Sequence, residues 1–143
     1  MRALGVDLGA RRIGLALSDP SGILASPAGI IVRGPDPATD HAALARRVSE
    51  AAVDVVVVGL PLSLSGATGP AARAVLAEVD ALKALLDVPV QTQDERFSTV
   101  VATRSLRQAA GGRAVKASRR RTGSVDEAAA AVLLQAWLDA RAG

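Results

Sequence analysis

The first hydrophobic pattern in the chain is a pair of short segments in which apolar residues alternate with small or polar ones. Positions 4 to 8 and positions 13 to 18 both follow the two-residue period of a β-strand. Between them lies Gly9–Arg12, which contains the glycine expected of a tight turn. The pattern therefore predicts a β-hairpin in which Asp7 lies near the end of the first strand.

Asp7 interrupts an otherwise apolar strand, and a carboxylate there costs free energy unless it has a partner. A metal ion is one possible partner, and the nearby Arg11 or Arg12 is another. Gly5 and Gly9 stand two residues to either side, so a large group such as a phosphodiester can approach the backbone closely. This segment alone does not decide between a ligand site and a structural ion pair.

The remaining pattern alternates between strands and helices. A third strand is expected at 23–33, with a bulge or an edge position, because Pro27 and Gly29 interrupt it. Further along the chain we expect a helix at 36–52, a β-branched strand at 53–59, a helix at 70–86, a strand at 88–93, a helix from 98 or 99 to 111 and a final helix at 124–139. Ser124 and Glu127 form a capping box that marks the start of the final helix, which is apolar on most sides and should pack deeply. This order of elements predicts an α/β fold.

Length and composition favour one domain and limit the metals that it can bind. The chain has 143 residues, so we expect a single domain over 1–143. It has no cysteine, which excludes disulfides and thiolate metal sites. Its one histidine, His41, excludes a multi-histidine centre and is expected to be a solvated surface residue. Any metal would be held mainly by carboxylates, which favours Mg²⁺ or Mn²⁺.

The hydrophobic pattern contains no candidate membrane segment. No apolar run approaches the ~18 residues needed to cross a bilayer. Asp7 also interrupts the only stretch that resembles the apolar part of a signal peptide. We therefore expect a cytoplasmic protein without a membrane partner.

Positive charge is concentrated near the last helix. The net charge is only +3, but the segment 113–121 carries Arg113, Lys116, Arg119, Arg120 and Arg121. It lacks periodicity and is expected to be a mobile loop that binds a polyanion, although a solvated charge run is the alternative. Aromatic residues are almost absent, so a nucleic-acid ligand would be recognised through its backbone rather than by base stacking.

Three acidic residues occupy comparable positions in the predicted elements. Asp7 is near a strand end, Glu95 follows a strand and Asp126 lies in the first turn of the final helix. Each has a structural explanation: Asp126 complements a helix dipole, and Glu95 pairs with neighbouring arginines. Considered singly, Glu95 and Asp126 are better explained as structural residues.

Four motifs together resemble the YqgF/RuvX family. In chain order they are Asp7–Gly14 with Ser18–Pro20 behind it, Gly59–Pro61 with Gly66 and Gly69, Asp94–Thr99, and Asp126 followed by Ala129–Ala130 and Leu133–Gln135. The resemblance covers nearly the whole chain in the right order and spacing. Arg11 stands where lysine is frequent and Ser98 where threonine is frequent, and both replacements keep the chemical group.

The resemblance implies a fold, a function and a set of site residues. It implies a ribonuclease H-like fold with a five-stranded mixed sheet, in which an antiparallel hairpin and a third strand precede two parallel strands and helices flank the sheet. The family is similar to Holliday junction resolvases, and membership implies a nuclease that matures the 5′ end of 16S ribosomal RNA. Asp7, Glu95 and Asp126 match the family's proposed catalytic acids.

Such acids suit phosphodiester hydrolysis by two divalent ions, with Asp7 as the shared ligand and Glu95 and Asp126 completing the two shells. Arg11, Arg12 and Arg96 are candidates for contact with the nucleic acid, and the basic segment would bind its backbone beyond the site.

Three alternatives stay open from the sequence. A Holliday junction resolvase acting on branched DNA would use the same acids, but it would need a dimer with two sites. A nucleic-acid-binding regulator without turnover is the second alternative. A sugar-kinase-type ATPase is the least favoured, because the chain is too short for a duplicated two-domain clamp. The sequence does not distinguish a monomer from a homodimer.

Overall fold

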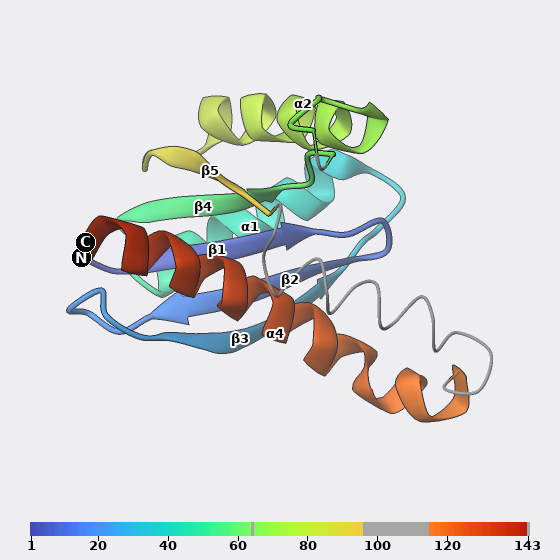
Figure 1. The fold of residues 1–143 in the computed structure, drawn as a ribbon, viewed down its shortest axis with the longest axis horizontal. Coiled ribbons are helices and arrows are strands. Elements are labelled where there is room, and N and C mark those ends of the chain that lie inside the picture. Colours follow the sequence, from blue (N-terminus) through green and yellow to red (C-terminus); the bar gives the residue numbers. More distant parts are fainter. Residues whose placement is uncertain (64, 96–114, 143) are drawn as a thin grey trace.

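The computed structural model describes residues 1–63, 65–95 and 115–142, with side chains from Asp126 onward in the last segment. Its centre is a five-stranded sheet of order β3-β2-β1-β4-β5 (Figure 1). The strands are β1 (Ala3–Leu8), β2 (Arg12–Ser18), β3 (Ala25–Val32), β4 (Val55–Leu60) and β5 (Val90–Asp94). The first three pair antiparallel, whereas β4 pairs parallel to β1 and β5 parallel to β4. This mixed sheet confirms the predicted fold class.

Helices cover both faces of the sheet. The helices α1 (Pro37–Glu50) and α2 (Pro70–Leu85) pack on one face, and α4 (Val115–Ala142) crosses the other, in front of the strands in Figure 1. The first core layer contains larger aliphatic side chains, among them Val6, Ile13, Leu44, Val56 and Leu82. The second layer is built with several small residues, among them Ala3, Ala16, Val57, Ala130 and Leu134. No helix in the described part of the chain has the length and apolarity to cross a membrane.

Small residues let α4 lie close to β1. Gly5 faces this helix, and a Cβ added there would lie 2.8 Å from Leu134 Cβ. Because successive strand residues point to opposite faces, Ala3, Gly5 and Asp7 share the α4 side of the sheet. The polar end of β1 is thus directed toward the helix that carries Asp126.

β3 is a bulged edge strand, as the sequence predicted. Its pairing with β2 shifts register between Gly14, opposite Ile30, and Ala16, opposite Pro27. Gly29 lies in the extra stretch with φ of 97°, a conformation that favours glycine. The Gly29 N–H donates to Glu127 Oε2 at 2.7 Å, so a side chain of α4 provides the hydrogen-bond acceptor for this backbone group near the bulge.

The start of the final helix was predicted wrongly. α4 begins at Val115 and contains 115–121, most of the segment 113–121 that was expected to be a mobile loop. Ser124 is therefore inside the helix, and Asp126 is not in its first turn. Lysine, alanine and arginine favour helices even without an apolar stripe, and the single Gly123 costs only about 1 kcal/mol. The expected helix from 98 or 99 to 111 lies outside the described residues, as do Arg96 and Arg113.

Candidate active site

Asp7 occupies the centre of the sheet near the carboxyl end of β1. It is 5% exposed and lies opposite Gly14 of β2. On the other side, β1 and β4 run parallel with Val6 beside Val58, so the next position places Asp7 beside Gly59. Asp7 therefore has a glycine on each neighbouring strand.

Asp126 approaches Asp7 from α4. It is 8% exposed, and its main chain lies directly over Gly14. A Cβ added at Gly14 would overlap the Asp126 carbonyl oxygen, so a larger residue there would push the helix away. Because Gly14 has no side chain, the backbone of Asp126 can lie against β2, the strand that pairs with β1 next to Asp7.

Glu95 lies on the other side of Asp7 from Asp126, next to β4. It follows β5 directly, is 1% exposed, and donates its backbone N–H to Leu60 O at 3.2 Å. Its carboxylate lies against Gly59, where an added Cβ would overlap Oε1. Gly59 thus accommodates Glu95 as Gly14 accommodates Asp126.

Three acidic residues that are far apart in the sequence therefore lie at the same end of the sheet. The row Gly14, Asp7, Gly59 crosses β2, β1 and β4, with Asp126 above one end and Glu95 above the other. All of the potential ligands are carboxylate oxygens, a donor set that fits Mg²⁺ or Mn²⁺. Within the described residues, no three acidic or histidine side chains already have the spacing of a metal site. An ion would have to draw these carboxylates together.

A cleft of about 500 Å³ opens beside Asp7 at the carboxyl ends of β1 and β4. In open α/β sheets, ligands bind at such strand ends. Asp7 and Asp126 line one part of the cleft, and α2 lines another with Ala71, Ala74 and Val75. Glu95 is not in the lining, but its carboxylate contacts Gly59, which is.

Burial and charge disfavour the ionised form of Glu95. Burial, with a further contribution from the negative charge of Asp94, raises the pKa of Glu95 to about 7. A cation nearby would favour the carboxylate and lower that pKa again. Four ionisable residues line the described part of the cleft. Arg33 and Glu78 form an ion pair, and the other two are Asp7 and Asp126.

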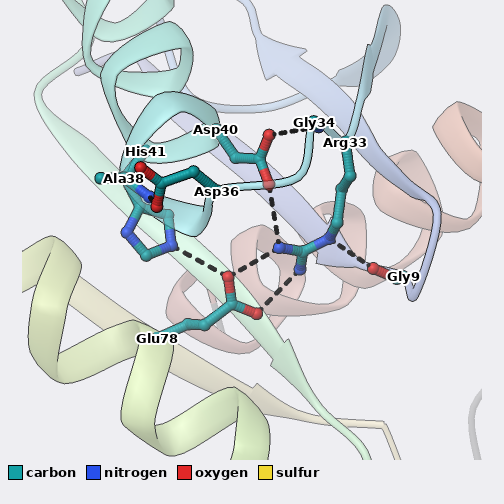
Figure 2. A network of polar contacts seen from close by, with 8 residues as sticks. All are labelled: Gly9, Arg33, Gly34, Asp36, Ala38, Asp40, His41 and Glu78. Atoms are coloured by element: carbon teal, nitrogen blue, oxygen red, sulfur yellow. Dashed lines mark hydrogen bonds and ion pairs between the residues drawn. The ribbon is translucent and has the colours of Figure 1, made fainter.

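A polar network borders the cleft and was not predicted from the sequence. Arg33 pairs with Glu78, which also bonds His41 Nε2 at 2.9 Å, and Asp40 lies beside Arg33 (Figure 2). His41 is 7% exposed, so the expectation of a solvated histidine was wrong. Burial opposes ionisation of Glu78, but hydrogen bonds from Arg33 and His41 hold its pKa below the usual value. The sequence signal was Glu78 itself, a charged residue between the buried positions of α2.

The basic residues proposed as nucleic-acid contacts fall into two described groups, and two more lie outside the described residues. Arg11 is exposed in the β1–β2 turn, and Arg12, the first residue of β2, is half-buried. Lys116 and the three arginines at 119–121 belong to α4, where the structure describes their backbone only. Arg96 and Arg113, as noted above, are outside the described residues.

Comparisons with known proteins agree with this architecture. A family model described as "RuvX: Holliday junction resolvase" matches residues 1–140. A Mycobacteroides abscessus protein is 45% identical, with coverage of 98% of this chain and 82% of that protein. A Thermobifida fusca protein is 50% identical, with coverage of 95% and 86%. Both bear the name "Putative pre-16S rRNA nuclease".

Among solved structures, Thermus thermophilus RuvC in complex with a Holliday junction substrate has the same fold. The TM-score is 0.57 at 18% identity, and the match covers 100% of this chain and 97% of RuvC. Free RuvC from the same organism matches with a TM-score of 0.56. The likeness supports the ribonuclease H-like fold that the motifs implied.

Proposed function

The chain belongs to the RuvX family, a nuclease family, and we propose that it is a metal-dependent endonuclease that matures the 5′ end of the 16S ribosomal RNA precursor. The observation that supports the proposal is the placement of Asp7, Glu95 and Asp126 at one end of the sheet, next to Gly14 and Gly59 and beside a cleft. The name of the two relatives, "Putative pre-16S rRNA nuclease", supports a ribosomal RNA precursor as the substrate, and the match covers 82% and 86% of their lengths. Action on a ribosomal precursor would place the protein in the cytoplasm.

The proposed chemistry is hydrolysis of a phosphodiester. Bound Mg²⁺ or Mn²⁺ would supply Lewis-acid stabilisation of the leaving oxygen and a water of lowered pKa. Asp7 is the proposed shared ligand because it lies between the other two acids in the row of strands. Glu95 and Asp126 would complete the ion shells from either side.

The charge of the site supports a role for metal ions. Among the described residues that line the cleft, the only cation is Arg33, and it is paired with Glu78. A phosphate group entering beside Asp7 and Asp126 would therefore meet carboxyl groups first. Divalent ions at these carboxylates would convert a repulsive site into one that attracts the scissile phosphate.

A second candidate function is resolution of four-way DNA junctions. It is favoured by the description of the matching family, and the acidic residues would be the same. A resolvase must cut two strands symmetrically, so it would act as a dimer with two sites. The binding regulator remains a third alternative and predicts no cleavage of either substrate.

One assay distinguishes these functions. The purified protein is incubated with a 5′-extended 16S precursor and, separately, with a four-way DNA junction, each with and without Mn²⁺. We expect Mn²⁺-dependent cleavage of the RNA, at a rate at least tenfold above that on the junction. Symmetric junction cleavage by a dimer, with the RNA left intact, would favour the resolvase. Binding of either substrate without cleavage would favour the regulator.

A further inference from the structure

We propose that Arg33 is a positioning residue that fixes the β1–β2 turn beside Asp7, and that Glu78 holds Arg33 in the orientation needed. The proposal rests on the proposed function only for its effect on cleavage. Its structural part concerns the turn Gly9–Arg11, which joins the strand of Asp7 to the strand of Gly14. Figure 2 shows the side chains involved.

Arg33 holds the turn at two points. Its side-chain Nε donates to the Gly9 carbonyl oxygen at 2.7 Å, and its backbone N–H donates to the Arg11 carbonyl at 2.9 Å. Gly9 in turn donates its N–H to the carbonyls of Asp7 and Arg12, both at 3.0 Å. A short chain of hydrogen bonds therefore runs from the Arg33 guanidinium to the main chain of Asp7.

Glu78 fixes the plane of the guanidinium. The two terminal nitrogens of Arg33 donate to the two carboxylate oxygens of Glu78, each at 2.8 Å. A bidentate pair of this kind defines the orientation as well as the position of the group. Once the plane is set, Nε is directed at Gly9. Lysine has one nitrogen and cannot serve Glu78 and Gly9 in this geometry.

Both helices of the α1–α2 layer support the pair. His41 of α1 bonds Glu78 at 2.9 Å, and Asp40 lies 3.5 Å from Arg33 while accepting the Gly34 N–H at 2.8 Å. The network joins α1, α2 and the segment after β3 to the turn. A turn anchored to three separate elements has little freedom to move relative to the sheet.

The position of the turn matters because it forms part of the cleft. Gly9 and Ala10 line the cleft together with Asp7, and Arg11 projects from the same turn as an exposed residue. The backbone here is tightly folded, since a Cβ added at Gly9 would lie 2.5 Å from Arg12 O. Loosening the turn would displace the main chain next to Asp7, and small displacements of reacting groups can lower a rate by up to about 100-fold.

The test compares Arg33→Lys with the matched control Arg46→Lys, an exposed arginine of α1 outside the network. Two quantities are measured: kcat and KM for cleavage of the RNA precursor, and hydrogen exchange of the backbone amides at 8–12. For Arg33→Lys we expect kcat to fall about 10- to 100-fold with KM changed less than about threefold. Exchange at 8–12 should rise more than exchange elsewhere, and Arg46→Lys should behave as wild type.

Substitutions of Glu78 provide a second route if Arg33→Lys does not fold. Glu78→Gln keeps an acceptor for one Arg33 nitrogen, whereas Glu78→Ala keeps none. The loss in kcat and the gain in exchange at 8–12 should therefore be smaller for Gln than for Ala. A purely structural role predicts that both variants lower the melting temperature without a local change in the turn.

The outcomes separate this inference from the proposed function. If the wild type cleaves RNA and Asp7→Asn does not, wild-type kcat or unchanged exchange at 8–12 in Arg33→Lys overturns the positioning role. If the wild type cleaves no RNA, the proposed function is wrong, and the exchange measurement alone still decides whether Arg33 fixes the turn.

Discussion

The carboxylate of Glu95 lies against the backbone of Gly59, so closely that a Cβ at position 59 would overlap Glu95 Oε1 and lie 2.9 Å from Leu133 Cδ2. Gly59 lies near the end of β4 and Glu95 directly follows β5, so this contact places an acidic residue beside β4, the neighbour of the central strand β1. Only glycine at position 59 leaves room for the Glu95 carboxylate in this position.

Gly59→Ala should therefore disable the site and destabilise the fold. The added methyl must displace the Glu95 carboxylate and Leu133, and overpacking of this kind costs about 1–3 kcal/mol. Cleavage should fall at least tenfold. The control is Gly69→Ala, since nothing lies within 4 Å of a Cβ there and only the N-cap of α2 is affected. It should cost less than about 1 kcal/mol.

Urea titration of both variants measures the free energies of unfolding. In the double variant Gly59→Ala with Glu95→Ala, part of the lost stability should return, because the overlapping carboxylate is gone. Strict additivity of the two changes would contradict the close contact.

Without metal, stability should fall as pH rises through the titration range of Glu95. Burial and then Asp94 raise the pKa of Glu95 from 4.5 to about 7, so the unfolded chain releases this proton at lower pH than the folded chain does. Between about pH 4.5 and about pH 7 the folded state binds more protons, and each further increase in pH favours unfolding. The loss at neutral pH is at most about 3 kcal/mol.

The measurement is the free energy of unfolding across that pH range in a chelating buffer, for wild type and for Glu95→Gln. Only the difference between the two proteins reports Glu95, because Glu78, with its lowered pKa, has the opposite dependence. The wild type should lose stability relative to the variant as pH rises, and Mn²⁺ should reduce that loss. A difference that does not change with pH would contradict the raised pKa.

The fold was largely predictable because its strands and first two helices carry clear local periods. β1 and β2 alternate, and α2 buries Val75, Val79 and Leu82 at helical spacing. The start of α4 was missed because the residues of 115–121 form a helix through intrinsic propensity, without an apolar stripe that a pattern can reveal.

The network around Arg33 was missed for a different reason. Arg33 and Glu78 are 45 residues apart, and His41 and Glu78 are 37 apart, so only tertiary packing brings together the segment after β3, α1 and α2. A charged residue on a helix is by default expected to face solvent. The acidic residues were identified by family motifs, and their catalytic role stays a prediction.

Replacing Arg119, Arg120 and Arg121 with alanine should weaken RNA binding and reduce its salt dependence. Each phosphate contact to a single strand contributes about 0.7 to the slope of log K against log salt, so three lost contacts reduce the slope by about two. Because the segment is helical in α4 and alanine favours helices, the melting temperature should change little.

Fluorescence anisotropy at several salt concentrations measures the slope. Arg46→Ala, on the surface of α1, is the control and should leave the slope unchanged. An unaltered slope in the triple variant would mean that the basic segment is only a solvated surface.

Asp7→Asn separates catalysis from folding, because it keeps the shape of the side chain and removes its charge. If Asp7 holds metal, cleavage should be abolished while RNA binding persists. In chelating buffer the variant should be at least as stable as wild type, because negative charge is removed from a cluster of acidic residues. If Asp7 is instead the structural partner of an arginine, the substitution should destabilise the protein, because it leaves that arginine without its counter-charge.

The decisive measurement is a melting curve with and without Mn²⁺, beside the cleavage assay. An ion that binds only the folded state stabilises it by about 2.7 kcal/mol when its concentration is about 100 times Kd. The wild type should gain stability of this order and Asp7→Asn much less. Asp80→Asn, which removes an exposed carboxylate of α2, should respond to Mn²⁺ as wild type does. Equal Mn²⁺ response and equal cleavage in wild type and Asp7→Asn would exclude Asp7 as a metal ligand and remove the basis of the metal-dependent nuclease.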